Sequence, residues 1–457
     1  MASKSKVSRQ AQSKVDKNFD KKLLAIPLIA LVIKLITITN IPGQVWLGAD
    51  GENYITGLNA LVNDGVFSTE RLLSYWPAGY PLLMFLFSVV SMQQTLLLTV
   101  LFQTFLYAFA SWYFVKQISK TILKKFAFPI ALIIAFNPTL SLSTLTIGYE
   151  SISAAIFILV VALFISEYLR SDRTLITWRS ISAAGLLSLS SFVQPRFVLA
   201  SILFLAIWAF ALKPKKIAVM FLVLTSVVLA VLPSSLVLRN VKANDFATIS
   251  TNLGITMNLG AGPGATGAYI KEGYGVPCDP IEGNEAQQDA HLRNCVISWY
   301  LKNPGKSLEL FYNKARFFWS PWSGPEASGS MARNPWLKIS PFVSIGSNSQ
   351  SGNDLVNGAF GKLTSWIWVL GSLVLLGFGL FRLWKAQGLA RYIGLSAGVI
   401  VIANWVVSVG TLGDHRQRLP IMTLSLFLQV IGFASLVQKR KYRIPVELPA
   451  PTQTGNK

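Results

Sequence analysis

Charged residues are scarce in this sequence. They make up 13% of the 457 residues, about half of the roughly 25% that a soluble globular domain carries. Hydrophobic residues make up 52%, and several apolar runs reach the ~20 residues that a helix needs to cross a bilayer. The scarcity of charge excludes an ordinary soluble domain. The sequence therefore predicts an all-α polytopic membrane protein.

Acidic residues are scarcer still: 20 stand against 41 Lys and Arg, for a net charge of +21. We expect spans over 23–41, 93–115, 126–147, 151–170, 180–193, 196–212, 217–238, 364–384, 390–410 and 418–438. With the N-terminus inside, the inner segments hold 25 basic residues against five acids, whereas the outer segments hold 15 of each. This follows the positive-inside rule. The basicity therefore predicts cytoplasmic termini and no nucleic-acid partner.

The span count gives a domain organisation. We expect a basic cytoplasmic tail over 1–22, an N-terminal transmembrane module over 23–238 with its first outer loop at 42–80, an extracytoplasmic loop domain over 239–363, C-terminal transmembrane helices over 364–438, and a cytoplasmic tail over 439–457. The apolar stretch at 81–92 is too short to cross the ~30 Å hydrocarbon core. We expect it to form a helix that reaches only half-way or lies at the surface.

Cysteine, histidine and glycosylation sequons are also rare. The two cysteines, Cys278 and Cys295, both fall in the largest outer loop, where a disulfide and two free thiols are both possible. The two histidines, His291 and His415, are too few for a His-based metal site. No Asn-X-Ser/Thr sequon with X other than Pro occurs, which favours a bacterial plasma membrane over the endoplasmic reticulum.

The first outer loop carries an acidic pair, Asp50 and Glu52. Behind it, Tyr54, Leu58 and Leu61 recur at the spacing of one helix face, which predicts an amphipathic helix over 50–65 in the membrane interface. Acids at a helix N-terminus are stabilised by the helix dipole. The pair is therefore either a helix-capping feature or a pair of functional carboxylates.

Other charged residues face the same compartment in this topology. They are Glu150 between two spans, Arg196 on a tight hairpin, and His415, Arg416 and Arg418 before the last span. Arginine matches phosphate oxygens with a planar fork, so these cations are candidates for a phosphate clamp. Arginines beside a span also contact lipid head groups, and for Arg196 both interpretations are open.

The loop domain ends in a second amphipathic stretch. A helix from Pro304 would carry Leu308, Phe311, Tyr312, Ala315 and Phe318 on one face. We expect this helix to lie on the outer leaflet, with Lys314 and Arg316 at head-group depth.

Together these stretches resemble the polytopic GT-C glycosyltransferases, the branch with the protein mannosyltransferases and aminoarabinose transferases. The resemblance is carried by Asp50-Gly51-Glu52, by Tyr75-Trp76-Pro77-Ala78-Gly79-Tyr80-Pro81, by Ala265-Thr266-Gly267-Ala268-Tyr269, by Asn303-Pro304-Gly305 with Trp319-Ser320-Pro321, and by Arg416-Gln417-Arg418-Leu419-Pro420. It implies a bundle of about 10 to 11 transmembrane helices with a large, mixed extracytoplasmic loop.

The same resemblance implies a polyprenyl-phosphate sugar donor held among membrane lipids and an inverting displacement on the extracytoplasmic side, with Asp50 as the base. Tyr54, Tyr80, Glu150, Arg196, His415, Arg416 and Arg418 would contact the substrates. Family members often have two adjacent acids, whereas Gly51 separates the acids here. Glu52 could then face the site, bind a metal or cap a helix. A divalent cation, if one binds, would take Asp50, Glu52 or Glu150.

Two other functions fit a membrane protein of this kind. A transporter or flippase usually places ionisable groups at mid-membrane and often shows internal repeats, whereas here the polar groups gather at one surface and we find no repeat. A polymerase or ligase of surface polysaccharide would use a lipid-linked oligosaccharide. The sequence identifies neither the sugar nor the acceptor.

Overall fold

The computed structural model describes residues 22–48, 50–170, 176–212, 214–268, 275–321 and 359–437. The terminal tails, residues 322–358 and Tyr269 lie outside the described residues. After a first span at Lys22–Thr39, the elements are η1 (Pro42–Gln44), β1 (Trp46–Leu47), α2 (Gly51–Asp64), α3 (Leu72–Tyr75), α4 (Gly79–Ser88), α5 (Thr95–Ile118), η2 (Lys124–Phe126), α6 (Ala127–Phe136), α7 (Pro138–Ser143), β2 (Thr146–Ile147), α8 (Glu150–Tyr168), α9 (Trp178–Val193), η3 (Pro195–Phe197), α10 (Val198–Leu212), α11 (Lys215–Asn244), α12 (Leu253–Leu259), α13 (Glu285–Lys302), α14 (Pro304–Phe318), α17 (Ala359–Lys385), α18 (Leu389–Gly410), η6 (His415–Arg418) and α19 (Leu419–Val437).

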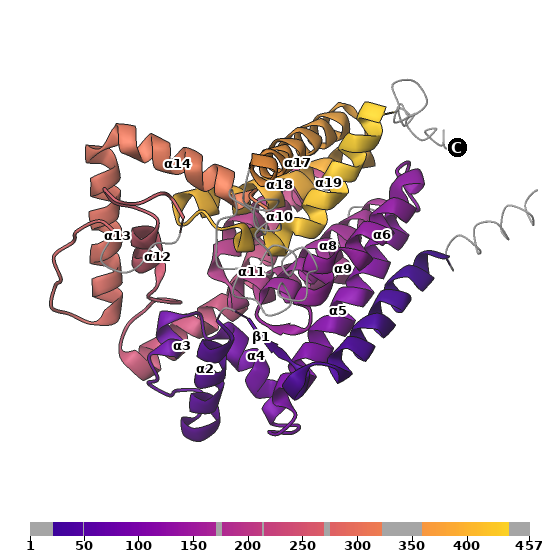
Figure 1. Ribbon diagram of the computed structural model, residues 1–457. Coiled ribbons are helices and arrows are strands. Elements are labelled where there is room, and N and C mark those ends of the chain that lie inside the picture. Colours follow the sequence, from indigo (N-terminus) through magenta and orange to yellow (C-terminus); the bar gives the residue numbers. More distant parts are fainter. Residues whose placement is uncertain are drawn as a thin grey trace, which may run out of the picture.

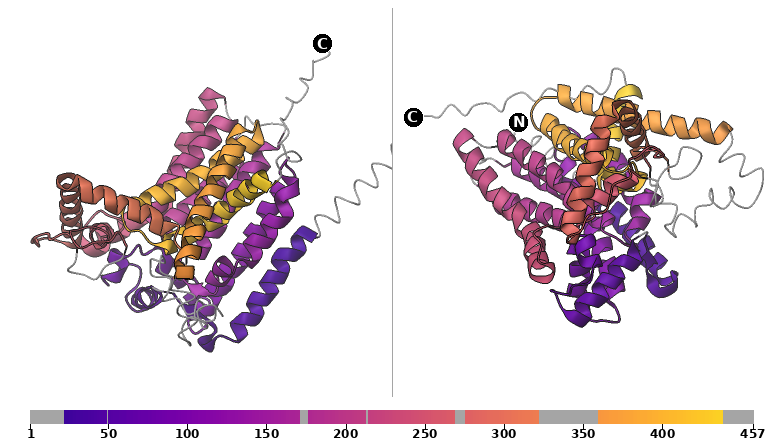
Figure 2. Two further views of the ribbon diagram at one scale, coloured as in Figure 1. Left: turned by 45° about the horizontal axis from the view of Figure 1, so that its top comes forward. Right: turned by 90° about the vertical axis from the view of Figure 1, so that its left-hand side faces the viewer.

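The described residues include seven helices that are long and apolar enough to cross a membrane: the first span, α5, α8, α11, α17, α18 and α19. They run side by side in Figure 1, and Figure 2 shows the same bundle from two further sides. Helix α8 is buried along almost its whole length and packs against α5, α9, α18 and α19. A helix that is apolar all round is typical of the centre of such a bundle. The prediction of an all-α polytopic membrane protein is confirmed.

One expected span is broken. The stretch 126–147 was expected to form a single helix, but α6 ends at Phe136 and a short helix, α7, starts at Pro138. Proline lacks an N–H, and it disfavours the helical conformation in the residue before it. Asn137 accordingly has extended backbone angles, and its side chain accepts a hydrogen bond from the backbone N–H of Leu140. The expectation of an unbroken helix here was wrong.

Helices α4, α9 and α10 are also apolar but are shorter than the seven. Helices α9 and α10 occupy the expected spans 180–193 and 196–212, with 16 and 15 residues. Helix α4 has 10 residues, which at 1.5 Å per residue is about half of the hydrocarbon thickness. This length agrees with the helix expected near 81–92. Its depth in a membrane stays a prediction.

The polar loops form a small module at one end of the bundle. Helices α12, α13 and α14 lie together on the left of Figure 1, with α2 and α3 below them, away from the end where the first span begins and α19 ends. The module has its own apolar cluster, which includes Ala261, Val296, Tyr300 and Leu310. A disulfide between Cys278 and Cys295 lies against this cluster.

Helix α14 buries only part of its apolar stripe. Leu308 and Tyr312 are 72% and 62% exposed, whereas Ser307, Leu310, Lys314 and Phe318 are buried. The buried residues have the three- and four-residue spacing of one helix face. The expected apolar stripe is therefore partly the outward face of the helix. Lys314, expected at head-group depth, lies inside the protein instead.

Candidate active site

A two-stranded parallel sheet brings two distant acids together. Trp46 pairs with Thr146 and Leu47 pairs with Ile147. Because parallel strands run in the same direction, the residues that follow them leave at the same edge. Asp50 follows β1 by three residues and Glu150 follows β2 by three residues. The sheet thereby places side by side two carboxylates that are 100 residues apart in the sequence.

Arg416 joins the two carboxylates. Its Nη2 lies 2.7 Å from Oδ2 of Asp50, and its Nε donates to Oε1 of Glu150 at 2.6 Å. The side chains of all three residues are at most 19% exposed. Hydrogen bonds between ionised partners are shorter and stronger than neutral ones, and the guanidinium fork fixes their geometry. With two carboxylates and one guanidinium, this acid–arginine cluster carries one net negative charge.

The two acids of the pair lie in different surroundings. Asp50 occupies the N-cap position of α2, but its side chain makes no capping hydrogen bond and pairs with Arg416 instead. Glu52 lies exposed in the first turn of α2, where an acid is favoured by the helix dipole. Asp50 and Glu150, not Asp50 and Glu52, are therefore the two carboxylates of the site.

Two tyrosines line the cluster. The rings of Tyr54 and Tyr80 lie 4.8 Å apart. Burial and the nearby charge of Asp50 raise the pKa of Tyr54 well above its usual value, so its hydroxyl stays protonated. The Tyr80 hydroxyl accepts from the backbone N–H of Gly148 at 2.8 Å and donates to Gln103 at 3.3 Å. Tyr80 thus fixes the turn that leads into Glu150.

Arg196 lies close to the same cluster. Its guanidinium carbon is 5.6 Å from the ring centre of Tyr149, the residue before Glu150. Its Nη2 lies 3.4 Å from the carbonyl oxygen of Gln417, the residue after Arg416. The amide of buried Asn404 donates to the same oxygen at 2.9 Å. Arg196 thus lies next to a sequence neighbour of Glu150 and next to a sequence neighbour of Arg416.

His415 and Arg418 point elsewhere. Nδ1 of His415 lies 3.3 Å from the hydroxyl of Ser320, and Arg418 donates to the Ser320 carbonyl at 3.3 Å. The guanidinium of Arg418 also lies 5.6 Å from the ring of Trp319. Both residues are buried. The structure therefore divides the expected three-residue clamp: Arg416 meets the carboxylates, and its neighbours meet the end of α14.

The chain is similar to two solved structures of an oligosaccharyltransferase. Two matching structures are those of the Archaeoglobus fulgidus oligosaccharyltransferase, in the apo form and tethered to an acceptor peptide containing the NVT sequon. They have TM-scores of 0.48 and 0.44 at 12% and 10% sequence identity, and each match covers 91% of this chain. The chain spans about half of that enzyme, 51% and 50% of its length.

A similarity of this extent carries no conclusion about activity. No protein-family model matches the sequence, and no curated protein matches it. The site must therefore be judged by its own geometry.

Among the described residues, the acids of the site do not gather as a set of metal ligands. In the part of the chain that the structure describes, no group of three or more His, Cys, Asp or Glu side chains could hold a metal ion. Glu52 is exposed, and Arg416 takes an oxygen of both other candidate ligands. The expectation that Asp50, Glu52 or Glu150 could take a divalent cation gains no support from this arrangement.

Sequence reasoning missed two polar side chains around the site, Gln103 and Asn404, and misplaced a third, Lys314. Gln103 donates to the carbonyls of Thr144 and Thr146 at 2.8 and 2.7 Å and so holds β2. Asn404 holds the backbone beside Arg416, and Lys314 donates to the carbonyl of Thr411 at 2.6 Å. The available signal was that Gln103 and Asn404 are polar residues inside apolar spans.

Proposed function

We propose that this protein is a membrane glycosyltransferase that moves a sugar from a polyprenyl-phosphate donor to an acceptor hydroxyl. The single observation that carries the proposal is Arg416 held between Asp50 and Glu150. The cluster combines a carboxylate, which can accept a proton, with a fixed cation that matches phosphate. Both groups are needed where a sugar leaves a lipid phosphate.

In this reaction the acceptor oxygen attacks the anomeric carbon of the sugar from the face opposite the phosphate. The carbon–oxygen bond to the phosphate breaks, and the polyprenyl phosphate leaves with one more negative charge than it had in the donor. The proton of the acceptor hydroxyl passes to the carboxylate of Asp50. A positioned general base typically contributes ~10²–10⁴ in rate.

Arg416 would stabilise the charge that develops on the leaving phosphate. Donors that are fixed before the reaction stabilise such charge without reorganising during it. Glu150 accepts from Nε of Arg416, and this hydrogen bond would hold the guanidinium in place while a phosphate oxygen takes the Nη groups. Asp50, released from Arg416, would then be free to accept a proton. Arg196 would add a second cation at the same edge of the site.

Tyr54 and Tyr80 would shape the sugar subsite. Both rings are buried beside the cluster, and the protonated hydroxyl of Tyr54 offers a donor to a sugar oxygen without adding charge. His415 and Arg418 would act indirectly, by fixing η6 to the end of α14.

The test begins with deletion of the gene. Mass spectrometry of lipid intermediates and surface glycans should show a polyprenyl-phosphate sugar that accumulates and a glycan or lipid that loses it. The purified protein in proteoliposomes should then transfer that sugar, and Asp50→Asn should abolish transfer while the protein still inserts into the membrane. Glu52→Gln is the matched control, since Glu52 is exposed two residues away. Near-normal transfer by Asp50→Asn would overturn the role of Asp50. Translocation of the lipid without transfer of its sugar would show that the protein is a flippase and not a glycosyltransferase.

A further inference from the structure

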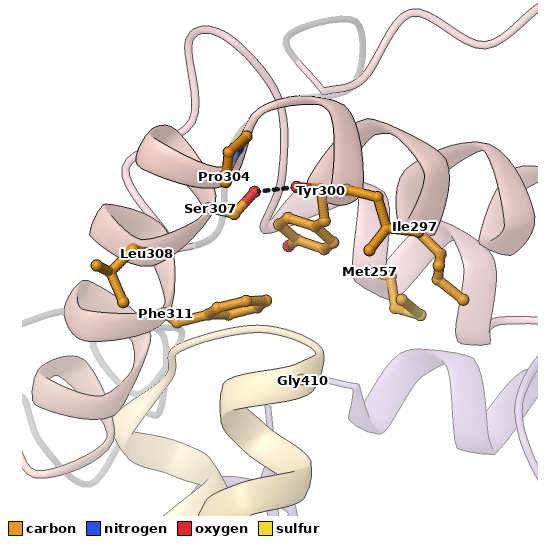
Figure 3. A pocket seen from close by; sticks show the side chains of 9 residues that line it. Met257, Ile297, Tyr300, Pro304, Ser307, Leu308, Phe311 and Gly410 are labelled. Carbon is orange, nitrogen blue, oxygen red and sulfur yellow. Dashed lines mark hydrogen bonds between the residues drawn. The ribbon is translucent and has the colours of Figure 1, made fainter.

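An apolar hollow lies between the outer helices and the end of a span. Its volume is about 510 Å³. Figure 3 shows Met257 from α12, Ile297 and Tyr300 from α13, Leu308 and Phe311 from α14, and Gly410 at the end of α18 around it. The hollow is open to the outside, and almost all of its lining is apolar. It is separate from the acid–arginine cluster, with which it shares no residue.

The rim of the hollow exposes large apolar side chains. Leu301 is 79% exposed, Leu308 is 72% exposed and Ile297 is 43% exposed. A contiguous apolar patch of this kind marks a surface that meets another apolar phase. The three side chains come from two consecutive helices, so the patch results from the packing of α13 against α14.

The hollow continues the outward face of α18. Ile402 and Val406 are exposed on this helix, and Gly410 follows at the same four-residue step, so all three lie on one helix face. Because α18 is long and apolar enough to span a membrane, exposed aliphatic side chains on it contact lipid chains. The face that carries these contacts therefore leads into the hollow.

Hydrogen bonds join the helices that form the hollow to the end of α18. The indole N–H of Trp405 on α18 donates to the carbonyl of Ala315 on α14 at 3.1 Å. The Lys314 ammonium group donates to the Tyr300 hydroxyl at 2.7 Å and to the carbonyl of Thr411 just beyond α18. These contacts hold α13 and α14 over the end of the span, at the level where hydrocarbon gives way to head groups.

Basic side chains flank the same rim. Lys302 follows Leu301 at the end of α13 and is exposed, and Lys306 lies in the first turns of α14. The ammonium group of Lys306 pairs with Glu309 at 2.9 Å. Lysines beside an apolar surface at the edge of a bilayer attract anionic head groups.

We infer that the hydrocarbon chain of a bilayer phospholipid, from the leaflet at which α18 ends, occupies this hollow. The head-group end of the chain lies among Leu308, Phe311 and Met257, and the chain then passes Gly410 and runs along Val406 and Ile402. Its head group faces Lys302. The lipid fastens the outer module to the bilayer through α13 and α14. Because the ring of Tyr300 lines the hollow and its hydroxyl binds Lys314, the same contact stabilises the loop that carries Arg416.

Photocrosslinking tests the site. The full chain is placed in nanodiscs of phosphatidylethanolamine and phosphatidylglycerol that contain a trace of phosphatidylglycerol with a diazirine near the head-group end of one acyl chain. After illumination, mass spectrometry should find lipid adducts on peptides of residues 285–318. Leu301→Ser with Leu308→Ser should lose these adducts. Tyr312→Ser is the matched control, because Tyr312 is exposed on α14 but does not line the hollow, and it should keep them.

A spin label at the rim gives an independent readout. The two native cysteines form a disulfide, so a nitroxide can be attached through Leu308→Cys or, on the next residue, through Glu309→Cys. The label at 308 should be more accessible to oxygen than to a water-soluble nickel chelate, and the label at 309 should show the reverse. Adducts confined to the spans, a water-accessible label at 308, or a protein–protein crosslink in place of the lipid would overturn the inference.

Discussion

The Lys314 ammonium group lies 2.6 Å from the carbonyl oxygen of Thr411 and 2.7 Å from the Tyr300 hydroxyl. This buried lysine joins α13, α14 and the loop that leads to Arg416. The backbone N–H of Gly413 donates to the carbonyl of Gly267 at 2.9 Å, so the glycine-rich run contacts the same loop. A Cβ on Gly413 would lie 2.6 Å from Cα of Lys314, which explains a glycine at this close approach.

Stability should depend on pH through Lys314. Burial lowers the pKa of Lys314 from 10.5 to about 7 in the folded protein. Between pH 7 and 10.5 the unfolded chain therefore binds more protons, so the free energy of unfolding rises with pH, by at most ~1.4 kcal/mol per pH unit. Below pH 7 Lys314 is charged in the folded protein, so the full free-energy cost of burying its ammonium group lowers the stability. Lys314→Met removes this dependence.

The check compares thermal unfolding of the wild type and of Lys314→Met in the same detergent at pH 6 and pH 9. The difference in stability between Lys314→Met and the wild type should favour the variant more at pH 6 than at pH 9. Lys306→Met, on the same helix but at the surface, should show no such change. An equal difference at both pH values would exclude Lys314 as the titrating group.

Arg416 should be needed for the stability of the site as well as for the reaction. Arg416→Ala leaves Asp50 and Glu150 side by side without their shared cation. Removing one partner of a buried ion pair costs about 3 kcal/mol or more. Arg416→Ala with Glu150→Gln should recover part of this loss, because one of the two charges is then gone. Thermal unfolding of both variants measures the coupling, and the absence of recovery would argue against direct contact.

Much of the fold could be predicted because apolar run length is a direct physical signal. Seven expected spans appear as single long helices. The break at Asn137–Pro138 was visible in the sequence, but hydropathy averaged over the window hides the missing N–H of one proline. For α14, the apolar pattern was detected; of its stripe only Phe318 is buried, and Leu308 and Tyr312 face outward. The helix buries a face that contains Ser307 and Lys314, because these polar groups find partners inside the protein.

The site could be predicted in composition but not in geometry. The charge count placed Asp50, Glu150, Arg196 and Arg416 on one side of the membrane. That Arg416 contacts Asp50 and Glu150 depends on strands of two residues each, which are too short to leave a periodic pattern. His415 and Arg418 share the motif of Arg416, but the 3-10 helix η6 turns them toward Ser320.

The strand pair itself can be tested at Gly48. A Cβ there would lie 2.7 Å from the carbonyl oxygen of Ile147, so Gly48→Ala must push β1 away from β2. We expect a cost of about 1–3 kcal/mol and a loss of transfer, because Asp50 and Glu150 separate. Gly185→Ala is the control: nothing lies within 4 Å of its added Cβ, and alanine is the better helix former. Full activity of Gly48→Ala would show that the sheet does not position the acids.

Arg239 should hold the segment between α2 and α3. This buried arginine at the outer part of α11 donates from Nε to the carbonyl of Val66 at 3.1 Å, from Nη1 to that of Leu73 at 3.1 Å, and from Nη2 to that of Ser68. The guanidinium group of Arg239 reaches the three carbonyls with three separate nitrogens. A lysine has a single nitrogen, so Arg239→Lys keeps the charge but loses most of the contacts. We expect a cost of roughly 2–4 kcal/mol, since hydrogen bonds to charged groups contribute ~1.5–3 kcal/mol each.

Hydrogen exchange measures this effect locally. In Arg239→Lys, backbone amides of residues 66–73 should exchange faster, while amides in the centre of α8 stay protected because that helix is buried along its length. Lys216→Arg, an exposed position near the other end of α11, is the control and should leave the exchange of 66–73 unchanged. Equal protection of this segment in Arg239→Lys and the wild type would show that the carbonyl contacts of Arg239 do not hold the loop. Faster exchange over the whole chain would indicate general unfolding instead.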